Sequence, residues 1–171
     1  MATILACGRL TKQKDYPTLF NAFALVRQER EDAWLTVLGE GEEREGLERL
    51  AGNLGISVNM PGFVTNPYDY MRRANCFVLS SAWEGFPNVL VEAMACGASV
   101  VATDCAGNGP REILEGGRWG RLVPVGCDGL LAAAILDTLH GPIDARERAM
   151  AFSVDAATER YLSLLAPART P

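Results

Sequence analysis

Apolar and polar residues fall along the chain in blocks that predict strands and helices in turn. Short apolar runs at 3–7, 33–39, 56–60, 76–80, 98–102 and 120–125 have the length and composition of buried strands. Segments with helical spacing of apolar residues, or with helix start and stop residues, follow at 18–30, up to about 54, 68–74, 88–96, 130–139 and 145–165. No hairpin signal joins two runs directly, so the alternation predicts an α/β fold with a doubly wound, mostly parallel, six-stranded sheet.

The most informative stretch is 80–97, SSAWEGFPNVLVEAMACG, because it places Glu84 and Glu92 around one strand–loop–helix junction. Pro87 or Asn88 begins the helix and Gly97 ends it, as the preferences of these residues for helix termini predict. The helix is apolar nearly all round, so we expect it to be buried. A buried carboxylate costs free energy unless it is paired, which makes Glu92 a candidate ligand-binding residue.

This junction suits a ligand that has an anionic centre and several hydroxyl groups. The free N–H groups at a helix start attract anions, and helix side chains lean toward the N-terminus, so Glu92 can reach back toward Glu84. A nucleoside diphosphate sugar fits this description. Taken singly, Glu84 is better explained as a solvated loop residue and Glu92 as a rim residue. The pair at one junction favours the ligand site.

Arg9 and Lys14 follow the first predicted strand, and Glu84 follows the fourth. The carboxyl ends of parallel strands meet at one edge of the sheet, where open α/β sheets bind their ligands. Two cations beside a helix N-terminus predict a cradle for a diphosphate. Taken alone, Arg9 and Lys14 are better explained as ordinary surface cations, which are common.

The same residues carry a resemblance to a known family, the retaining, GT-B-fold glycosyltransferases of group 1, also called family 4. Its motifs match here in identity and order as Gly8-Arg9-Leu10 with Lys14, Gly39-Glu40-Gly41, Pro61-Gly62-Phe63 and the double glutamate, and Phe152-Ser153 with Tyr161 is similar to the family's end. The resemblance covers Thr3 to about Leu165. It implies a Rossmann-like sheet, the C-terminal half of a GT-B fold. Residues 1–171 would then be a single donor-binding domain, and the acceptor-binding N-terminal domain would be absent from this chain.

The resemblance also implies roles for individual residues. Glu84 would contact the donor sugar, Glu92 the ribose hydroxyls, and Arg9 and Lys14 the diphosphate as it leaves, so that Arg9, Lys14 and Glu84 are the candidate catalytic residues. The remaining donor-binding residues would be Gly8, Phe63, Val64, Gly85, Phe86, Pro87, Asn88 and Val89. Most of these would act through backbone groups, although Pro87 has no N–H to offer. Asn108 to Glu112 resembles a segment on the sugar side of the site, but a helix cap explains it nearly as well.

The implied activity is that of a hexosyltransferase, moving a sugar from a nucleotide diphosphate sugar to a glycan, lipid or polysaccharide precursor with retention of configuration. A UDP-sugar is favoured as donor, no cofactor is expected, and no Asp-x-Asp motif indicates a metal site. The chain alone is expected to bind nucleotide without turnover. Two alternatives stay open, a nucleotide-sugar epimerase of GT-B fold and a non-catalytic nucleotide-binding domain.

Composition and charge limit the partners, the cellular compartment and the kinds of site that we expect. The net charge of −5 and the lack of a basic run argue against nucleic acid as a partner. The five cysteines lack metal-clip spacing, so we expect reduced thiols and a cytoplasmic protein. The apolar runs are too short to span a bilayer, and membrane contact is expected only through the missing domain. His140, the sole histidine, is expected to end a helix, and Gly39 with Gly41 lacks the third glycine of a dinucleotide fingerprint.

Overall fold

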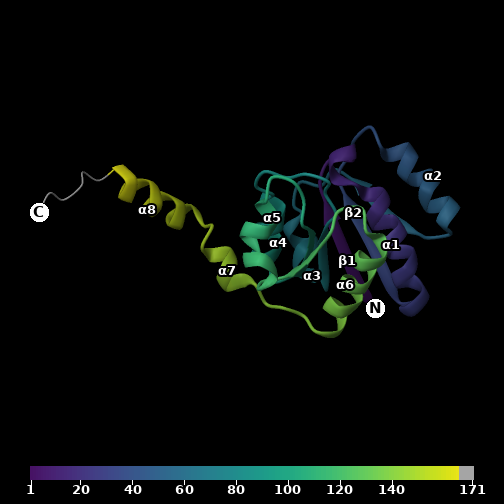
Figure 1. The fold of residues 1–171 in the computed structure, drawn as a ribbon. Helices are drawn as coiled ribbons and strands as arrows, with labels where there is room; N and C mark the ends of the chain where they lie inside the picture. Colours follow the sequence, from purple (N-terminus) through teal and green to yellow (C-terminus); the bar gives the residue numbers. More distant parts are fainter. Residues whose placement is uncertain (166–171) are drawn as a thin grey trace, which may run out of the picture.

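The computed structural model describes residues 1–165, which form one six-stranded sheet with helices on both faces (Figure 1). The strand order is β3-β2-β1-β4-β5-β6, and every pairing is parallel. The strands are β1 Ala2–Cys7, β2 Ala33–Leu38, β3 Val58–Gly62, β4 Cys76–Leu79, β5 Ser99–Thr103 and β6 Arg121–Val123. This arrangement confirms the predicted doubly wound sheet. The order reverses between β1 and β4, which makes their carboxyl ends the topological switch point.

The helices bury the two faces separately. One apolar cluster joins the sheet to α1 (Tyr16–Glu29), α2 (Arg44–Leu54) and α6 (Asp128–His140). The other joins it to α3 (Tyr68–Arg73), α4 (Asn88–Ala95), α5 (Gly109–Ile113) and α7 (Arg146–Met150). A final helix, α8 (Val154–Leu165), leads away from this body (Figure 1). None of the helices within residues 1–165 is long and apolar enough to cross a membrane.

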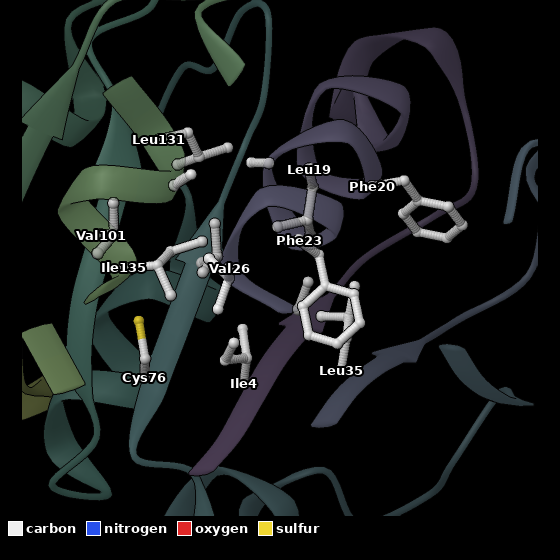
Figure 2. Packing of buried hydrophobic residues seen from close by; sticks show 14 of the residues in the cluster. Ile4, Leu19, Phe20, Phe23, Val26, Leu35, Cys76, Val101, Leu131 and Ile135 are labelled. Atoms are coloured by element: carbon white, nitrogen blue, oxygen red, sulfur yellow. The ribbon is translucent and has the colours of Figure 1, made fainter. Parts of the chain in front are cut away.

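The interior explains why the strands read as continuous apolar runs. Along β1, Ile4 packs into the cluster under α1 and α6, whereas Leu5 packs into the cluster under α4. Figure 2 shows Ile4 beside Val26 and Ile135, which come from α1 and α6. Strands that are covered on both sides need apolar residues at every position, and this is the usual pattern of parallel sheets.

The third strand differs from its prediction. It runs from Val58 to Gly62 rather than over 56–60, so Pro61 and Gly62 lie inside the strand instead of following it. β3 is an edge strand that pairs only with β2 in this sheet. A proline is tolerated in an edge strand because its missing N–H leaves no acceptor unpaired on the open side. The pairing of β2 with β3 also shifts register between Thr36 and Leu38. The apolar pattern of the sequence does not indicate this shift.

The C-terminal segment was expected to be one helix with a break near 153–155. It is two helices, α7 and α8, and the break lies slightly earlier, at residues 151–153. Ser153 precedes α8, and its hydroxyl accepts a hydrogen bond from the Ala156 N–H at 3.2 Å. Serine is a preferred residue at a helix start for this reason, so a new helix begins there.

Candidate functional site

An ion pair between Lys14 and Glu84 lies at the switch point. Lys14 ends a short 3-10 turn (Lys12–Lys14) after β1, and Glu84 lies in the loop after β4. Lys14 Nζ is 2.5 Å from Glu84 Oε1, and the two side chains are only 15% and 8% exposed. The hydroxyl of Ser81 donates to the same oxygen at 2.7 Å. Buried charges persist only when they are paired and hydrogen-bonded, and this arrangement satisfies that condition for both residues.

Further hydrogen bonds tie the loop after β1 to the loop after β4. Ser80 Oγ donates to the Lys14 carbonyl at 2.7 Å. The side chain of Gln13 donates to the Trp83 carbonyl at 3.0 Å, and the Ala82 N–H donates to the Gln13 carbonyl at 2.8 Å. The two loops are therefore held as one unit. The sequence motifs did not single out Ser80 and Ser81, and their position at a carboxyl edge was the available signal for a role in the site.

Glycines let a second layer of backbone approach the Gly8 loop closely. A Cβ atom built on Gly39 would lie 2.0 Å from the Gly8 carbonyl oxygen, and one on Gly41 would lie 2.3 Å from the Leu10 carbonyl oxygen. Gly39 also has a φ of +134°, a conformation that side chains rarely adopt. The Gly39-Glu40-Gly41 segment therefore supports the loop that carries Arg9.

The Glu84 loop is supported in the same way from the segment before α5. A Cβ atom on Gly107 would lie 1.9 Å from the Glu84 carbonyl oxygen, and one on Gly109 would lie 1.9 Å from the Gly85 carbonyl oxygen. Asn108, between them, adopts a left-handed backbone conformation and forms no side-chain cap on α5. The helix-cap explanation of this segment is therefore incomplete, because its glycines pack directly behind the Glu84 loop.

A cavity of about 530 Å³ opens beside the ion pair, within the usual range for small-molecule sites. It brings together four predicted residues, Gly8, Arg9, Phe63 and Val64, and Phe63 is 79% exposed. Of the rest of its wall, the sequence singled out only Gly39 and Glu40, as part of a family motif. The remaining lining residues are Cys7, Leu38, Gly39, Glu40, Thr65 and Pro67. The loop and helix residues from Glu84 to Glu92 are not part of this wall.

The expectation that Glu92 is buried is wrong. α4 fully buries Leu90, Ala93 and Met94, whereas Glu92 is half-buried. The helix is apolar nearly all round, but one side of it remains partly open. Burial, and after it the charge of Glu92, raises the pKa of the Cys7 thiol in the cavity wall, while Lys14 acts in the opposite direction. The charge of Glu92 therefore acts on a thiol that lines the cavity.

The N-terminus of α4 lies directly after the Glu84 loop. Pro87 occupies the cap position, and Asn88 is the first helical residue rather than a side-chain cap. The first N–H groups of any α-helix have no partner inside the helix, so those of Asn88 and Val89 are available to an anion. This is the arrangement that the sequence predicted, except that no side chain caps the helix.

Other predicted features lie elsewhere. His140 is the last residue of α6 and is exposed, far along the chain from the glutamate pair. Within residues 1–165 no three His, Cys, Asp or Glu side chains converge as metal ligands do. A second cavity, of about 390 Å³, is lined by Thr3, Tyr70 and Arg73 among others, and contains none of the predicted site residues.

Comparison with known proteins places this chain in a family. Residues 2–141 match the family described as glycosyl transferases group 1. A phosphatidyl-myo-inositol mannosyltransferase of Mycobacterium tuberculosis is 35% identical over 166 residues, which are 93% of this chain and 43% of that protein. An uncharacterized glycosyltransferase of Methanocaldococcus jannaschii is 41% identical over 109 residues, 63% of this chain and 27% of that protein.

The fold agrees with this match. The crystal structure of HepE from Anabaena in complex with UDP superposes with a TM-score of 0.84 at 24% identity, covering 96% of this chain and 48% of that one. The chain spans less than half the length of each of these three proteins. With its six-stranded parallel sheet and a family match over most of its length, the chain belongs to the group 1 glycosyltransferases.

Proposed function

We propose that this chain is the donor-binding domain of a retaining hexosyltransferase. The observation that carries the proposal is the buried Lys14–Glu84 pair, set at the switch point between a nucleoside-sized cavity and the N-terminus of α4. Each of these three parts suits one portion of a nucleotide diphosphate sugar. The following assignments are the consequences of placing that ligand there.

The diphosphate would lie between Arg9, Lys14 and the first amides of α4. Arg9 is exposed at the cavity, and within residues 1–165 its guanidinium forms no ion pair. An ammonium has three N–H donors, so Lys14 keeps two for a ligand after bonding Glu84. Cleavage of the sugar–phosphate bond builds negative charge on the departing diphosphate. Fixed cations and helix amides stabilise such charge without a metal, which is why we propose a metal-independent reaction.

Glu84 would receive hydroxyls of the donor sugar. Both of its side-chain hydrogen bonds, from Lys14 and Ser81, fall on Oε1. No buried side-chain nitrogen or oxygen within the described residues lacks a partner, so the second oxygen, Oε2, is the one accessible at the surface. An ionised carboxylate only accepts hydrogen bonds, and this suits a sugar hydroxyl as the donor.

The nucleoside would occupy the cavity. Phe63 presents an exposed ring at its wall, and the backbone of Val64 offers groups to a base. Glu92, half-buried near Cys7, would accept from the ribose hydroxyls. We propose a UDP-sugar as donor, supported by the UDP found in the HepE crystal structure.

The acceptor side of the reaction lies outside this chain. Since the chain spans less than half of its relatives, we propose that a second, acceptor-binding domain completes the enzyme. The acceptor would be a glycan, lipid or polysaccharide precursor, as the mannosyltransferase relative acts on a phosphatidylinositol by its name. We further propose a cytoplasmic enzyme whose membrane contact is made through that domain. This chain by itself would bind nucleotide but transfer no sugar.

Calorimetric titration of the chain with UDP, GDP and ADP, in EDTA, tests the proposal. We expect one nucleotide to bind without metal. A ligand present at a hundredfold over its dissociation constant stabilises a protein by about 2.7 kcal/mol, so thermal unfolding gives an independent check. The proposal would be contradicted if none of the three nucleotides bound either the chain or the full-length protein. Loss of sugar transfer in full-length Glu84→Ala would exclude a non-catalytic nucleotide-binding domain.

A further inference from the structure

The Glu84 loop is touched by the segment that leads into α8. The rings of Phe86, in that loop, and Phe152, between α7 and α8, are 5.4 Å apart at an interplanar angle of 60°. Edge-to-face contacts of this geometry are attractive because the positive edge of one ring meets the negative face of the other. Phe86 is otherwise open, with 48% of its surface exposed. The position of Phe86 therefore depends on its aromatic partner more than the position of a fully buried ring would.

Arg148 holds Phe152 in place. The guanidinium carbon of Arg148 lies 4.6 Å from the centre of the Phe152 ring, within range of a cation–π interaction. The same guanidinium donates to the carbonyls of Ile113 and Glu112, each at 2.9 Å, and forms an ion pair with Glu115 at 3.1 Å. These partners of Arg148 all lie in α5 or in the turn after it. Phe152 is thus anchored to the body of the domain.

The helix that carries Arg148 is itself fixed. Ala145 and Ala149 are buried in the cluster that α7 shares with α4. Ahead of α7, the Ser99 hydroxyl donates to the Ile143 carbonyl and accepts from the Ile143 N–H, each at 3.0 Å. Figure 1 shows α7 lying beside α4 while α8 leads away. Phe152 therefore directly follows α7, which packs against the domain, and does not belong to α8, which leads away from it.

The loop is supported on its other side through the backbone alone. The Glu84 N–H donates to the Ala106 carbonyl at 2.9 Å, and Gly107 and Gly109 pack against the carbonyls of Glu84 and Gly85. These contacts involve only the backbone, so the position of the Phe86 side chain depends on its contact with Phe152. The loop is held between a glycine layer behind it and a ring on its Phe86 side.

From these contacts we infer that Phe152 is a positioning residue for the Glu84 loop, acting through Phe86. This inference rests on the proposed function, because the first amides of α4, at Asn88 and Val89 directly after Phe86 and Pro87, are taken there to face the phosphates. The inferred role of Phe152 is indirect, because its contact in this region is with the Phe86 ring. Its effect is to keep the loop in the binding conformation before the ligand arrives, which lowers the entropy lost on binding.

The experiment compares Phe152→Ala and Phe152→Tyr in this chain, with Tyr161→Ala as a matched control. Tyr161 lies in α8 and is 70% exposed, so its loss removes an aromatic ring from the same segment without touching the loop. The first measurement is NMR relaxation of the Gly85 and Phe86 amides, which needs no ligand. The second is the dissociation constant of UDP by calorimetry. Amide exchange of β1 and β4 confirms that each variant is folded.

We expect the order parameters of Gly85 and Phe86 to fall from about 0.85, typical of a rigid backbone, toward about 0.6 in Phe152→Ala. UDP should bind about threefold to tenfold more weakly, the range set by one aromatic pair. Phe152→Tyr keeps the ring and should restore both values, and Tyr161→Ala should change neither. Unchanged order parameters in folded Phe152→Ala, or a loop already mobile in the wild-type chain, would overturn the inference.

The two readouts separate this inference from the proposal on which it rests. If wild-type chain binds no UDP, the proposed donor fails, and the order parameters still decide whether Phe152 holds the loop. If wild-type chain binds UDP and Phe152→Ala binds equally well with an equally rigid loop, the donor site stands and the positioning role is wrong.

Discussion

Lys14 Nζ lies 2.5 Å from Glu84 Oε1, although 70 positions of sequence separate the two residues. The pair joins the loop after β1 to the loop after β4 at the point where the strand order reverses. Ser81 adds a third member by donating to the same carboxylate oxygen. In the proposed reaction, Lys14 would be oriented by Glu84 before the diphosphate binds, so that little reorganisation accompanies the charge that develops there.

Replacing Lys14 with Met should destabilise the fold strongly, because it leaves the Glu84 carboxylate buried without its cation. Breaking a buried pair by removing one partner costs about 3–5 kcal/mol. The double variant Lys14→Met/Glu84→Gln removes both charges and should recover most of that loss. The free energy of unfolding in urea measures both effects.

The exposed pair of Arg49 and Glu45 provides the matched control for this prediction. Its atoms are 3.8 Å apart and its side chains are 72% and 87% exposed. Arg49→Met should change the free energy of unfolding by no more than about 0.5 kcal/mol. A double variant at 14 and 84 that is as unstable as Lys14→Met alone would show that the lost packing of the lysine, and not the unpaired charge, is responsible.

Gly109→Ala should disturb the Glu84 loop, because Gly109 packs directly against it. The added methyl would lie 1.9 Å from the Gly85 carbonyl oxygen and 2.9 Å from Pro87 Cδ, so the loop has to move. We expect a lower melting temperature and UDP binding at least about tenfold weaker, since a shift of about 1 Å in a site costs far more than its own strain. Gly129→Ala, with no atom within 4 Å, is the control and should be neutral or slightly stabilising. Equal behaviour of the two variants would contradict the close packing seen here.

Glu92→Ala should weaken nucleotide binding while leaving stability nearly unchanged, because the carboxylate is half-buried and forms no ion pair within residues 1–165. A hydrogen bond to a charged group contributes about 1.5–3 kcal/mol, so we expect a loss of about tenfold or more in affinity for UDP. Calorimetry in EDTA measures this, with Glu45→Ala as the surface control. A lower melting temperature with unchanged affinity would assign Glu92 a structural role instead.

The buried thiol of Cys76 should make the fold less stable at alkaline pH. Burial raises the pKa of this thiol from 9.0 to about 12, with the charge of Arg121 acting in the opposite direction. The folded state therefore holds the proton more tightly than the unfolded state. The resulting stability is complete below pH 9 and is lost as the pH rises toward 12, at about 1.4 kcal/mol per pH unit.

Unfolding in urea at pH 7, 9 and 10 tests this prediction by comparing wild-type chain with Cys76→Ala. The variant loses packing at every pH, so the informative quantity is the difference between the two proteins. That difference should be constant up to pH 9 and should shrink above it. A difference that stays constant to pH 10 would show that the thiol does not govern the alkaline limit. Tyr16, whose pKa burial also raises, contributes equally to both proteins.

Local patterns in the sequence were enough to predict the parallel sheet, the order of its elements and the edge on which Arg9, Lys14 and Glu84 lie. Apolar runs, proline and glycine positions act over a few residues, and the carboxyl edge follows from any alternation of strands and helices. The helix start at Asn88 and its stop before Gly97 were predictable for the same reason. The family resemblance, which the match over residues 2–141 supports, named the motifs.

The pairing of distant residues was decided only by the tertiary structure. Whether Lys14 contacts Glu84, whether Gly109 packs on Gly85, and whether Phe152 meets Phe86 depends on loops and crossovers that bring separate segments together. The exposure of Glu92 was misjudged because the apolar character of α4 does not tell how much of the helix its neighbours cover. The register of β3 was missed for a related reason, since an edge strand is aligned by its partner and not by its own residues. Sequence periodicity determined the elements of this domain, and packing between them determined which side chains share the site.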